Sequence, residues 1–248
     1  MKKNDLTSIY HNLADVYDHI MNFIDYKAWA DYINTIKKTH VNKTRNILEL
    51  AAGTGGITKY LLKRYPEILI TDISASMLKK VKGSSRKVCC KMNELPFKNK
   101  FDFVYSCFDS VNYLTSKKEL RKLFANVRQI LSDDGVFTFD VSLEKNSINH
   151  SAQPVRKGEY NKIKFEQRSI YNKETLIHKN IFLFSDSENN KIYEVHRQKI
   201  YPFETYFELI EREGLYVIDC FDAFSFNQGM PNSERLQFIV KKNNYVNF

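Results

Sequence analysis

The sequence predicts an α/β fold in which a doubly wound, mostly parallel sheet is covered by helices on both faces. Three observations predict it. Short apolar runs alternate with helical patterns between about residues 46 and 141, as in chains of βαβ units. Three of the eight glycines lie within residues 53–56, between a strand and a helix, where such sheets bind ligands. An acidic residue, Asp72, ends the next strand.

The first half of this core follows a strand–helix order. Residues 46–50 are expected to form a buried strand, and Ile57 begins a helical apolar pattern that Pro66 ends. Ser74 stands at the N-cap position of the helix after the second strand. Four later strands are expected at residues 68–72, 88–91, 101–106 and 136–141.

The second half contains the clearest helix of the chain. Ser116 and Glu119 have the spacing of a capping box, and the apolar residues after them keep to one helical face through Leu131, before the turn at Gly135. A further helix is expected over residues 202–214. Two last strands, at residues 216–221 and 236–240, bring the main sheet to seven expected strands.

Two segments lie outside this alternation. Residues 1–40 carry helical patterns rich in aromatic residues, and we expect them to form a lid. Residues 150–200 alternate apolar and polar side chains, which predicts antiparallel strands inserted after the fifth core strand and lying over the ligand pocket. With 248 residues, the chain is expected to form one domain, 1–248.

The net charge of +9 raises the possibility of a nucleic-acid partner. Lysine outnumbers arginine 28 to 10, however, and no run of lysines is longer than two. Surfaces that follow a phosphate backbone cluster their charge and use arginine for bidentate contacts. A nucleic-acid partner is therefore not favoured.

The sequence also bears on compartment and metal content. No window of eighteen apolar residues predicts a membrane span, and no signal peptide is recognisable, so a cytoplasmic location is expected. The four cysteines have neither a Cys-x-x-Cys spacing nor nearby histidines at metal-binding distance. We therefore expect reduced thiols and no metal.

The glycine loop and the acids beside it indicate a cofactor. Asp72 lies nineteen residues after Gly53, where a carboxylate can accept hydrogen bonds from both hydroxyls of a ribose. Either NAD or S-adenosylmethionine fits this geometry. Glu49, directly before the loop, would repel a diphosphate but attract a cofactor that carries a sulfonium and an ammonium group. S-adenosylmethionine is favoured, and a loop without a ligand would leave Asp72 unexplained.

At this point the chain resembles a known superfamily. Residues 47–55 look like motif I of the class I S-adenosylmethionine-dependent methyltransferases, and residues 70–78 look like their acidic motif II. Residues 91–97, followed by the strand at 101–104, resemble the third motif. The resemblance implies the Rossmann-like, seven-stranded methyltransferase sheet with an antiparallel β insertion, and S-adenosylmethionine as the cofactor.

A closer resemblance narrows the group. Tyr17-Asp18-x-x-Met21 and residues 107–114 are similar to a bacterial group of small-molecule methyltransferases, to which nucleotide-sugar N,N-dimethyltransferases look related. Two positions depart from the pattern. Ala51 replaces the usual first glycine, which we expect to be tolerated, and Lys91 stands where the family often has aspartate.

The resemblance implies roles for particular residues. Glu49 would face the methionine amino group, Asp72 the ribose, and Met92 the adenine. The cofactor-binding residues implied are Tyr17, Glu49, Ala51, Gly53, Thr54, Gly55, Asp72, Ile73, Met77, Met92, Asn93 and Ser106. Those implied for the acceptor are Asp109, Asn112 and Tyr113, and those for catalysis are Tyr17, Tyr113 and His196. Core packing remains the alternative for Met92, Tyr17 and Tyr113, and a structural role for His196.

The function expected is methyl transfer to a nitrogen or oxygen of a small-molecule acceptor by direct displacement. A tRNA or rRNA methyltransferase and a non-catalytic subunit that binds S-adenosylmethionine remain alternatives. The sequence indicates neither the acceptor nor the oligomeric state.

Overall fold

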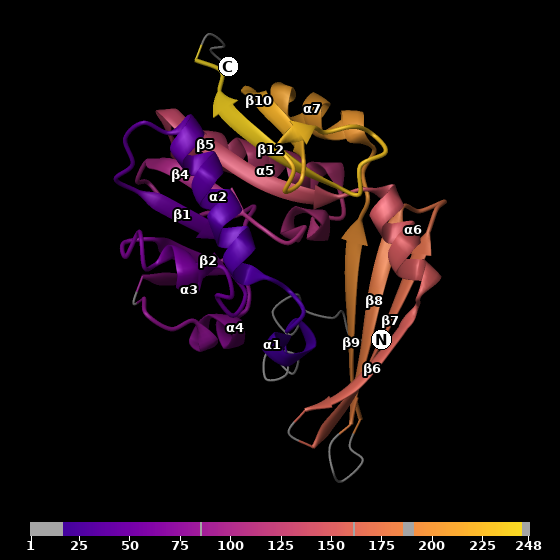
Figure 1. The fold of residues 1–248 in the computed structure, drawn as a ribbon. Coiled ribbons are helices and arrows are strands. Elements are labelled where there is room, and N and C mark those ends of the chain that lie inside the picture. The colour runs from indigo at the N-terminus through magenta and orange to yellow at the C-terminus, as the bar shows by residue number, and fades with distance from the viewer. Residues whose placement is uncertain (1–16, 85, 161, 186–190, 245–248) are drawn as a thin grey trace.

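Two sheets organise the molecule, and the smaller one projects from one end of the larger (Figure 1). The structure is a computed structural model, and it describes residues 17–84, 86–160, 162–185 and 191–244. The larger sheet has eight strands in the order β11-β10-β12-β5-β4-β1-β2-β3. The smaller sheet has four strands in the order β6-β7-β8-β9.

Five adjacent strands of the larger sheet run parallel to one another. Its parallel strands are β1 (Ile47–Leu50), β2 (Leu69–Asp72), β3 (Lys87–Cys89), β4 (Phe101–Ser106) and β5 (Leu131–Ser142). Three antiparallel strands complete it, namely β10 (Leu215–Asp222), β11 (Asn227–Gln228) and β12 (Arg235–Lys242). The seven strands expected are thus present, and the two-residue β11 adds an eighth that is too short to leave a pattern in the sequence.

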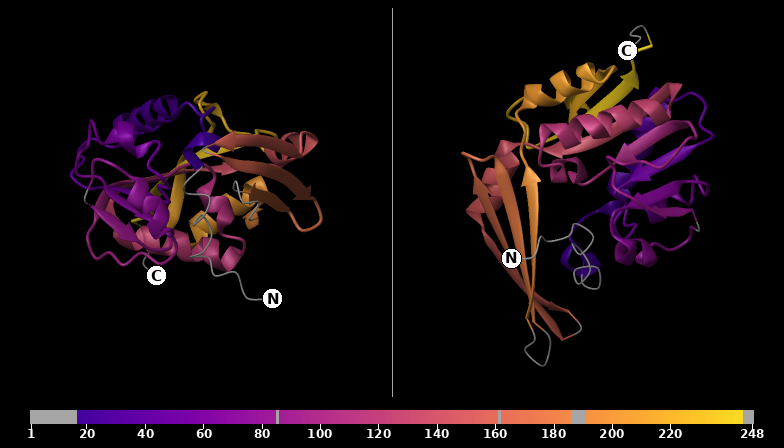
Figure 2. Two further views of the ribbon diagram at one scale, coloured as in Figure 1. Left: turned by 90° about the horizontal axis from the view of Figure 1, so that it is seen from below. Right: turned by 180° about the vertical axis from the view of Figure 1, so that it is seen from behind.

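Helices cover both faces of this sheet, as expected for a doubly wound fold. One apolar layer packs the sheet against α2 (Tyr26–His40), α3 (Thr58–Leu61) and α4 (Ala75–Lys80). The opposite layer contains α5 (Lys117–Ile130) and α7 (Phe203–Arg212), which lie together in the view from behind (Figure 2). The predicted capping box is present, because the Ser116 hydroxyl accepts from the Glu119 N–H while the Glu119 carboxylate accepts from the Ser116 N–H.

Two element boundaries differ from the sequence-based expectation. The helix after the glycine loop, expected from Ile57 to Pro66, is reduced to the single turn of α3. The fifth strand begins at Leu131, immediately after α5, and not at residue 136. Leu131 pairs with Phe101 and Val136 pairs with Phe103, so the turn expected around Asp133 and Gly135 is an irregularity in the pairing of β4 with β5.

The inserted segment forms a long antiparallel sheet. It follows α6 (Glu144–Ala152) and consists of β6 (Val155–Tyr160), β7 (Ile163–Asn172), β8 (Ile177–Ser185) and β9 (Lys191–Lys199). The 3₁₀ helix η3 (Ser110–Tyr113), which follows β4, packs against β9 and joins this sheet to the core.

The first described helix lies between the two sheets (Figure 1). This helix, α1 (Tyr17–Ile20), packs Ile20 against Phe165, Phe182 and Phe184 of the inserted sheet. Residues 1–16 of the expected lid lie outside the described residues. The division into a lid, a core and inserted strands stays a prediction. Within the described ranges, no helix is long and apolar enough to cross a membrane.

Candidate active site

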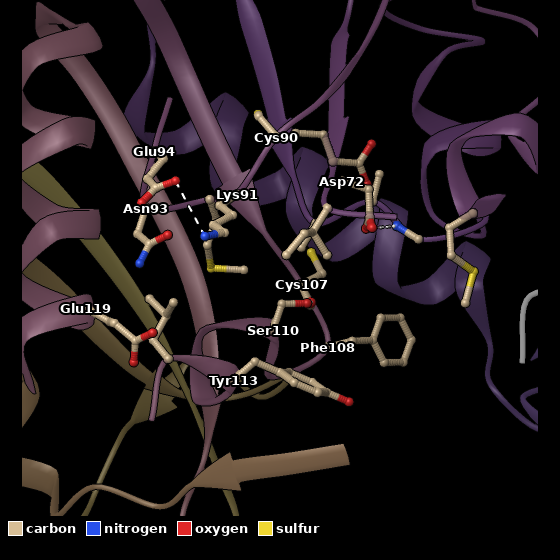
Figure 3. A pocket seen from close by; sticks show the side chains of 18 of the residues that line it. Asp72, Cys90, Lys91, Asn93, Glu94, Cys107, Phe108, Ser110, Tyr113 and Glu119 are labelled. Carbon is tan, nitrogen blue, oxygen red and sulfur yellow. Dashed lines mark hydrogen bonds and ion pairs between the residues drawn. The ribbon is translucent and has the colours of Figure 1, made fainter. Parts of the chain in front are cut away.

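A cavity of about 620 Å³ opens at the carboxyl ends of β1, β2 and β4. In open α/β sheets, ligands bind at this edge. Figure 3 shows side chains from several segments around one space, among them Asp72, Cys107 and Tyr113. The sequence-predicted residues that line it are Tyr17, Glu49, Ala51, Gly53, Thr54, Asp72, Ile73, Met77, Met92, Asn93 and Tyr113. Most of the predicted cofactor-binding residues are therefore brought to one place.

The glycine loop bends sharply between β1 and α3. Ala51, Gly53 and Gly55 all have positive φ angles, of 54°, 59° and 81°. Ala51 therefore adopts a left-handed conformation that a glycine would adopt without steric cost, which explains why its position is usually glycine. A Cβ atom at Gly53 would meet nothing within 4 Å, whereas one at Gly55 would meet the Val81 side chain at 3.0 Å. Gly53 thus faces the cavity, and Gly55 permits packing on Val81.

Asp72 connects this loop to the next helix. Its Oδ2 accepts from the Gly53 N–H at 2.8 Å, and its Oδ1 accepts from the Ser74 N–H at 2.7 Å. Burial raises the pKa of Asp72, although the hydrogen bonds from Ser74 and Gly53 oppose the shift. An ionised carboxylate has about four lone-pair sites, so two backbone hydrogen bonds leave capacity for the two hydroxyls of a ribose.

Glu49 is buried at the end of β1 and lines the same cavity. The Thr58 hydroxyl donates to Glu49 Oε2 at 2.6 Å. Burial raises the pKa of Glu49 to about 7, and the hydrogen bond from Thr58 opposes this. A cation in the cavity would favour the ionised form. The acid is thus suited to an ammonium group, but its charge near neutral pH depends on that partner.

The other end of the cavity contains Met92 and Asn93, the predicted adenine contacts. Lys91 lies beside them and forms an ion pair with Glu94 at 3.6 Å, which Figure 3 marks. Glu94 also accepts from Lys122 at 2.7 Å. The lysine at the position of the usual family aspartate is thus paired with an acid that it shares with Lys122, and Met92 lines the cavity.

Helix α1 contacts the glycine loop. Asp18 Oδ1 accepts from the Thr54 hydroxyl at 2.5 Å, so α1 is hydrogen-bonded to the glycine loop. Tyr17 lines the cavity, and burial raises its pKa well above the ordinary value. Its phenol therefore stays neutral. A neutral phenol beside a cationic ligand is favourable through its oxygen or its ring face.

Comparisons with known proteins agree with this geometry. Residues 47–135 match the model of a methyltransferase domain family. YqeM of Bacillus subtilis, which is named as a methyltransferase, is 27% identical over 96% of this chain and 99% of its own. The structure of an S-adenosylmethionine-dependent methyltransferase from Clostridium acetobutylicum superposes with a TM-score of 0.79, at 24% identity, over 95% of this chain and 99% of that one.

This chain is an S-adenosylmethionine-dependent methyltransferase. Its fold is also that of the sugar N-methyltransferase KedS8 from Streptoalloteichus, with a TM-score of 0.73 and 17% identity over 98% of this chain and 96% of that one. The residues at the cavity fit this cofactor. The buried acids Glu49 and Asp72 can accept hydrogen bonds from an amino group and from ribose hydroxyls. The backbone of Gly53 is open to the cavity, because this residue has no side chain.

Two residues predicted to bind the acceptor instead belong to the framework of this methyltransferase. Asn112 is fully buried, and its amide nitrogen donates to the carbonyls of Ser142 and Lys199 while its oxygen accepts from the Ser142 N–H. Asp109 forms an ion pair with Arg235 at 3.2 Å. Neither lines the cavity. The predicted acceptor contacts are thus replaced by bonds that hold η3 in place.

Two of the predicted cofactor-binding residues also lie behind the cavity wall. Gly55 packs on Val81, as described above, and Ser106 is buried at the end of β4. Within the described ranges, the Ser106 hydroxyl has no hydrogen-bond partner. Neither residue lines the cavity. Cys107 does line it, and burial raises the pKa of its thiol well above the ordinary value, so it is a neutral wall residue.

The structure brings together two residues that were predicted separately for catalysis. Tyr113 lines the cavity, and its hydroxyl lies 3.2 Å from His196 Nδ1. His196 itself is buried behind Tyr113. No group of three or more metal-ligating side chains occurs in the described part of the chain.

The sequence reasoning missed Glu194 and the pairing of Asp140 with Arg235. Glu194 Oε2 lies 3.4 Å from His196 Nε2, a contact that the i, i+2 spacing within an alternating strand could have suggested. Arg235 forms an ion pair with Asp140, which is fully buried in β5. No local signal indicates the second pair, because 95 residues separate its members.

Proposed function

We propose that this methyltransferase transfers the methyl group of S-adenosylmethionine to a nitrogen or oxygen of a small molecule that enters between the central sheet and the inserted sheet. One observation carries the proposal. Tyr17 of α1 and Tyr113 of η3 both line the cavity, and these two elements contact the inserted sheet. The cavity therefore extends from the cofactor loop to α1 and η3, the two elements that contact the inserted sheet.

One face of the inserted sheet supports an acceptor that carries hydroxyl or amino groups. It carries uncharged side chains that can both donate and accept hydrogen bonds. Gln167 and Ser169 of β7 donate to the Asn180 oxygen of β8, at 3.0 and 2.7 Å. Gln198 of β9 donates to Asp109 at 2.8 Å. The same face also carries Phe165, Phe182 and Phe184. An acceptor with both polar groups and apolar ring surface would match this mixture, because buried polar groups require partners.

The fold similarity to KedS8 is compatible with such an acceptor, since that protein is named as a sugar N-methyltransferase. At a sequence identity of 17%, the similarity indicates a shared fold but does not identify the substrate. The acceptor of this enzyme is therefore proposed from its own inserted sheet, with KedS8 as a guide for the choice of test compounds.

The chemistry requires mainly positioning. S-adenosylmethionine supplies a methyl group on a sulfonium that is already an activated leaving group. Glu49 would hold the amino group, Asp72 the ribose hydroxyls and Met92 the adenine, so that the methyl group faces Tyr17 and Tyr113. Holding two reactants in line at about 3–3.5 Å supplies a large part of the rate enhancement. Covering of the site by α1 and the inserted strands would exclude water.

The proposal is tested in two steps. Isothermal titration with S-adenosylhomocysteine, and with NAD as the control, should show micromolar binding of the first alone. Tritiated S-adenosylmethionine is then incubated with a panel of amino sugars, primary amines and hydroxylated metabolites, and in parallel with bulk tRNA. Label transferred to a member of the small-molecule panel is expected. Label found only in tRNA would replace the proposed acceptor class, and binding without any transfer would favour a non-catalytic subunit.

A further inference from the structure

We propose that Tyr113, His196 and Glu194 form a proton relay that removes a proton from the acceptor during methyl transfer. The inference rests on the proposed function, because it concerns the same cavity. It assigns Tyr113 as the catalytic residue that touches the acceptor. His196 and Glu194 act through Tyr113 and are positioning residues.

The three side chains form one chain of contacts that leads away from the cavity. The Tyr113 hydroxyl lies 3.2 Å from His196 Nδ1, and His196 Nε2 lies 3.4 Å from Glu194 Oε2. Tyr113 lines the cavity, whereas His196 and Glu194 are 1% and 7% exposed. Figure 3 shows the Tyr113 ring next to Ser110 and Phe108 at the cavity wall. Contacts of this length shorten when a substrate binds in many active sites.

The relay requires one arrangement of protons. An ionised carboxylate only accepts hydrogen bonds, so with Glu194 ionised the proton of the neutral His196 ring would lie on Nε2. Nδ1 would then accept from the Tyr113 hydroxyl. Each member consequently donates in the direction of Glu194. This is the direction in which a proton taken from the acceptor would move.

The position of the relay is fixed by the framework around it. Gln198 of β9 donates to Asp109 Oδ2 at 2.8 Å, and Asn112 donates to the Lys199 carbonyl at 2.9 Å. These bonds join η3 to β9 beside the Tyr113–His196 contact. They give Asp109 and Asn112 a function in the site even though neither reaches the cavity.

The inserted sheet also holds the imidazole ring. Phe182 of β8 packs edge-to-face on His196, with 5.2 Å between the ring centroids. Asn180 is the cross-strand partner of His196, and Phe182 is the cross-strand partner of Glu194. All of these side chains lie on one face of the sheet, because alternate residues of a strand share a face. The ring is therefore packed in the orientation that the relay needs.

The proposed step balances in atoms and charge. The lone pair of the acceptor nitrogen or oxygen forms a bond to the methyl carbon, and the carbon–sulfur bond breaks with its electron pair remaining on sulfur. The acceptor proton moves to the Tyr113 oxygen while the tyrosine proton moves to His196 Nδ1. The positive charge that was on sulfur is then on the imidazolium, beside the Glu194 carboxylate. Solvent takes the extra proton after product release.

The first test measures the histidine directly. We would label the protein with ¹⁵N-histidine and record long-range ¹H–¹⁵N spectra at pH 7.5 with saturating S-adenosylhomocysteine, identifying His196 from the missing signal in His196→Gln. The relay predicts an unprotonated Nδ1 and a protonated Nε2. Tyr113→Phe should shift the Nδ1 resonance and Glu194→Gln the Nε2 resonance. A protonated Nδ1 would overturn the relay.

The second test measures turnover with the amino-sugar and amine panel, scored by released S-adenosylhomocysteine. Tyr113→Phe and His196→Gln should each lower kcat by about 10²-fold or more, without a change in affinity for S-adenosylhomocysteine. The matched controls are Tyr193→Phe, an exposed tyrosine of β9, and His150→Gln, an exposed histidine of α6. Unchanged kcat in both relay variants would remove the proposal.

The two tests separate the relay from the proposed function. If no member of the panel is methylated, the small-molecule acceptor is wrong, and the tautomer of His196 still decides whether the chain of contacts exists. If the panel is methylated and the tautomer is reversed, the acceptor class stands and the relay is refuted. Preserved S-adenosylhomocysteine binding shows in either case that a variant has folded.

Discussion

Asp72 Oδ2 accepts a hydrogen bond from the backbone N–H of Gly53, with 2.8 Å between the two atoms. The acid that was predicted to bind the ribose therefore also holds the glycine loop in its shape. Its other oxygen accepts from Ser74 at the start of α4. The buried carboxylate at the end of β2 thus links the glycine loop that follows β1 to the start of α4.

Asp72→Ala should weaken both cofactor binding and the fold. Two ribose hydroxyls would lose their acceptor, which we expect to cost about 1–3 kcal/mol of S-adenosylhomocysteine affinity. The buried N–H groups of Gly53 and Ser74 would also lose theirs, which should lower the free energy of unfolding by about 1–3 kcal/mol. Titration calorimetry and urea unfolding measure the two effects. Asp134→Ala, an exposed aspartate in β5, is the control, and unchanged affinity in Asp72→Ala would refute the ribose assignment.

Cofactor binding should release a proton from Glu49. The pKa of this acid is raised to about 7 in the cofactor-free protein, mainly by burial. The amino group of the ligand favours the carboxylate, so affinity for S-adenosylhomocysteine should rise between pH 5 and 7, by up to about tenfold per pH unit, and then level off. Calorimetry in two buffers with different ionisation enthalpies detects the released proton. Glu49→Gln, which can still accept from Thr58, should abolish the release, and a flat pH profile in the native protein would contradict the assignment.

The same shift predicts how stability depends on pH. The folded pKa of Glu49 is about 7 against an ordinary value of 4.5, so the folded state holds a proton that the unfolded chain has lost. The contribution is fully present below pH 4.5 and is lost as the pH rises to about 7. Relative to Glu49→Gln, the native protein should thus lose up to about 3 kcal/mol of unfolding free energy between pH 4.5 and 8. Denaturant unfolding at pH 5 and 8 measures this difference, and equal differences at both values would show an unshifted acid.

The two glycines of the loop should respond differently to alanine. Gly55→Ala adds a Cβ at 3.0 Å from Val81 and at a φ of 81°, so we expect a loss of about 2 kcal/mol of stability with little change in cofactor affinity. Gly53→Ala meets no protein atom within 4 Å, so its loss of stability should be about 1 kcal/mol, while a ligand in the cavity would meet the new methyl group. Thermal unfolding and S-adenosylhomocysteine titration of both variants test the pair. Loss of affinity confined to Gly55→Ala would reverse the assignment of the cavity-facing glycine.

Arg235→Met should destabilise the protein strongly. The arginine pairs with Asp109 and with the fully buried Asp140, whose pKa burial raises to about 6 even with the arginine present. Without it, a buried carboxylate would lack its partner charge, which costs about 3–5 kcal/mol. The pKa of Asp140 would rise further, so the deficit should be larger at pH 8 than at pH 5.5. Arg212→Met, an exposed arginine at the end of α7, is the control for loss of charge alone.

Much of the core could be predicted because its signals are local. The strand patterns, the capping box of Ser116 and the glycine loop each depend on residues close together in the chain, and all are present in the structure. Their order along the chain restricted the topology, since parallel strands need crossover helices. The acids Glu49 and Asp72 could be placed at the cavity because the carboxyl ends of parallel strands meet at one edge.

The roles of single polar residues behind the cavity could not be predicted in this way. The sequence around Asn112 is compatible with a side chain that binds a ligand and with one that binds neighbouring strands. Only its hydrogen bonds to Ser142 and Lys199 show that it has the second role. The short β11 and the start of β5 at Leu131 likewise depend on pairing partners in other parts of the chain.

The linear order of residues is sufficient to specify the α/β core, the cofactor loop and the class of cofactor, because each follows from hydrophobic periodicity, backbone freedom at glycine and the charge of adjacent acids. Folding decides which distant side chains share a microenvironment. Tyr113 and His196 are 83 residues apart in the chain, and Arg235 and Asp140 are 95 apart. Such contacts arise from the docking of the inserted sheet and the last strand on the core, and burial then determines the protonation and strength of the interactions that they form.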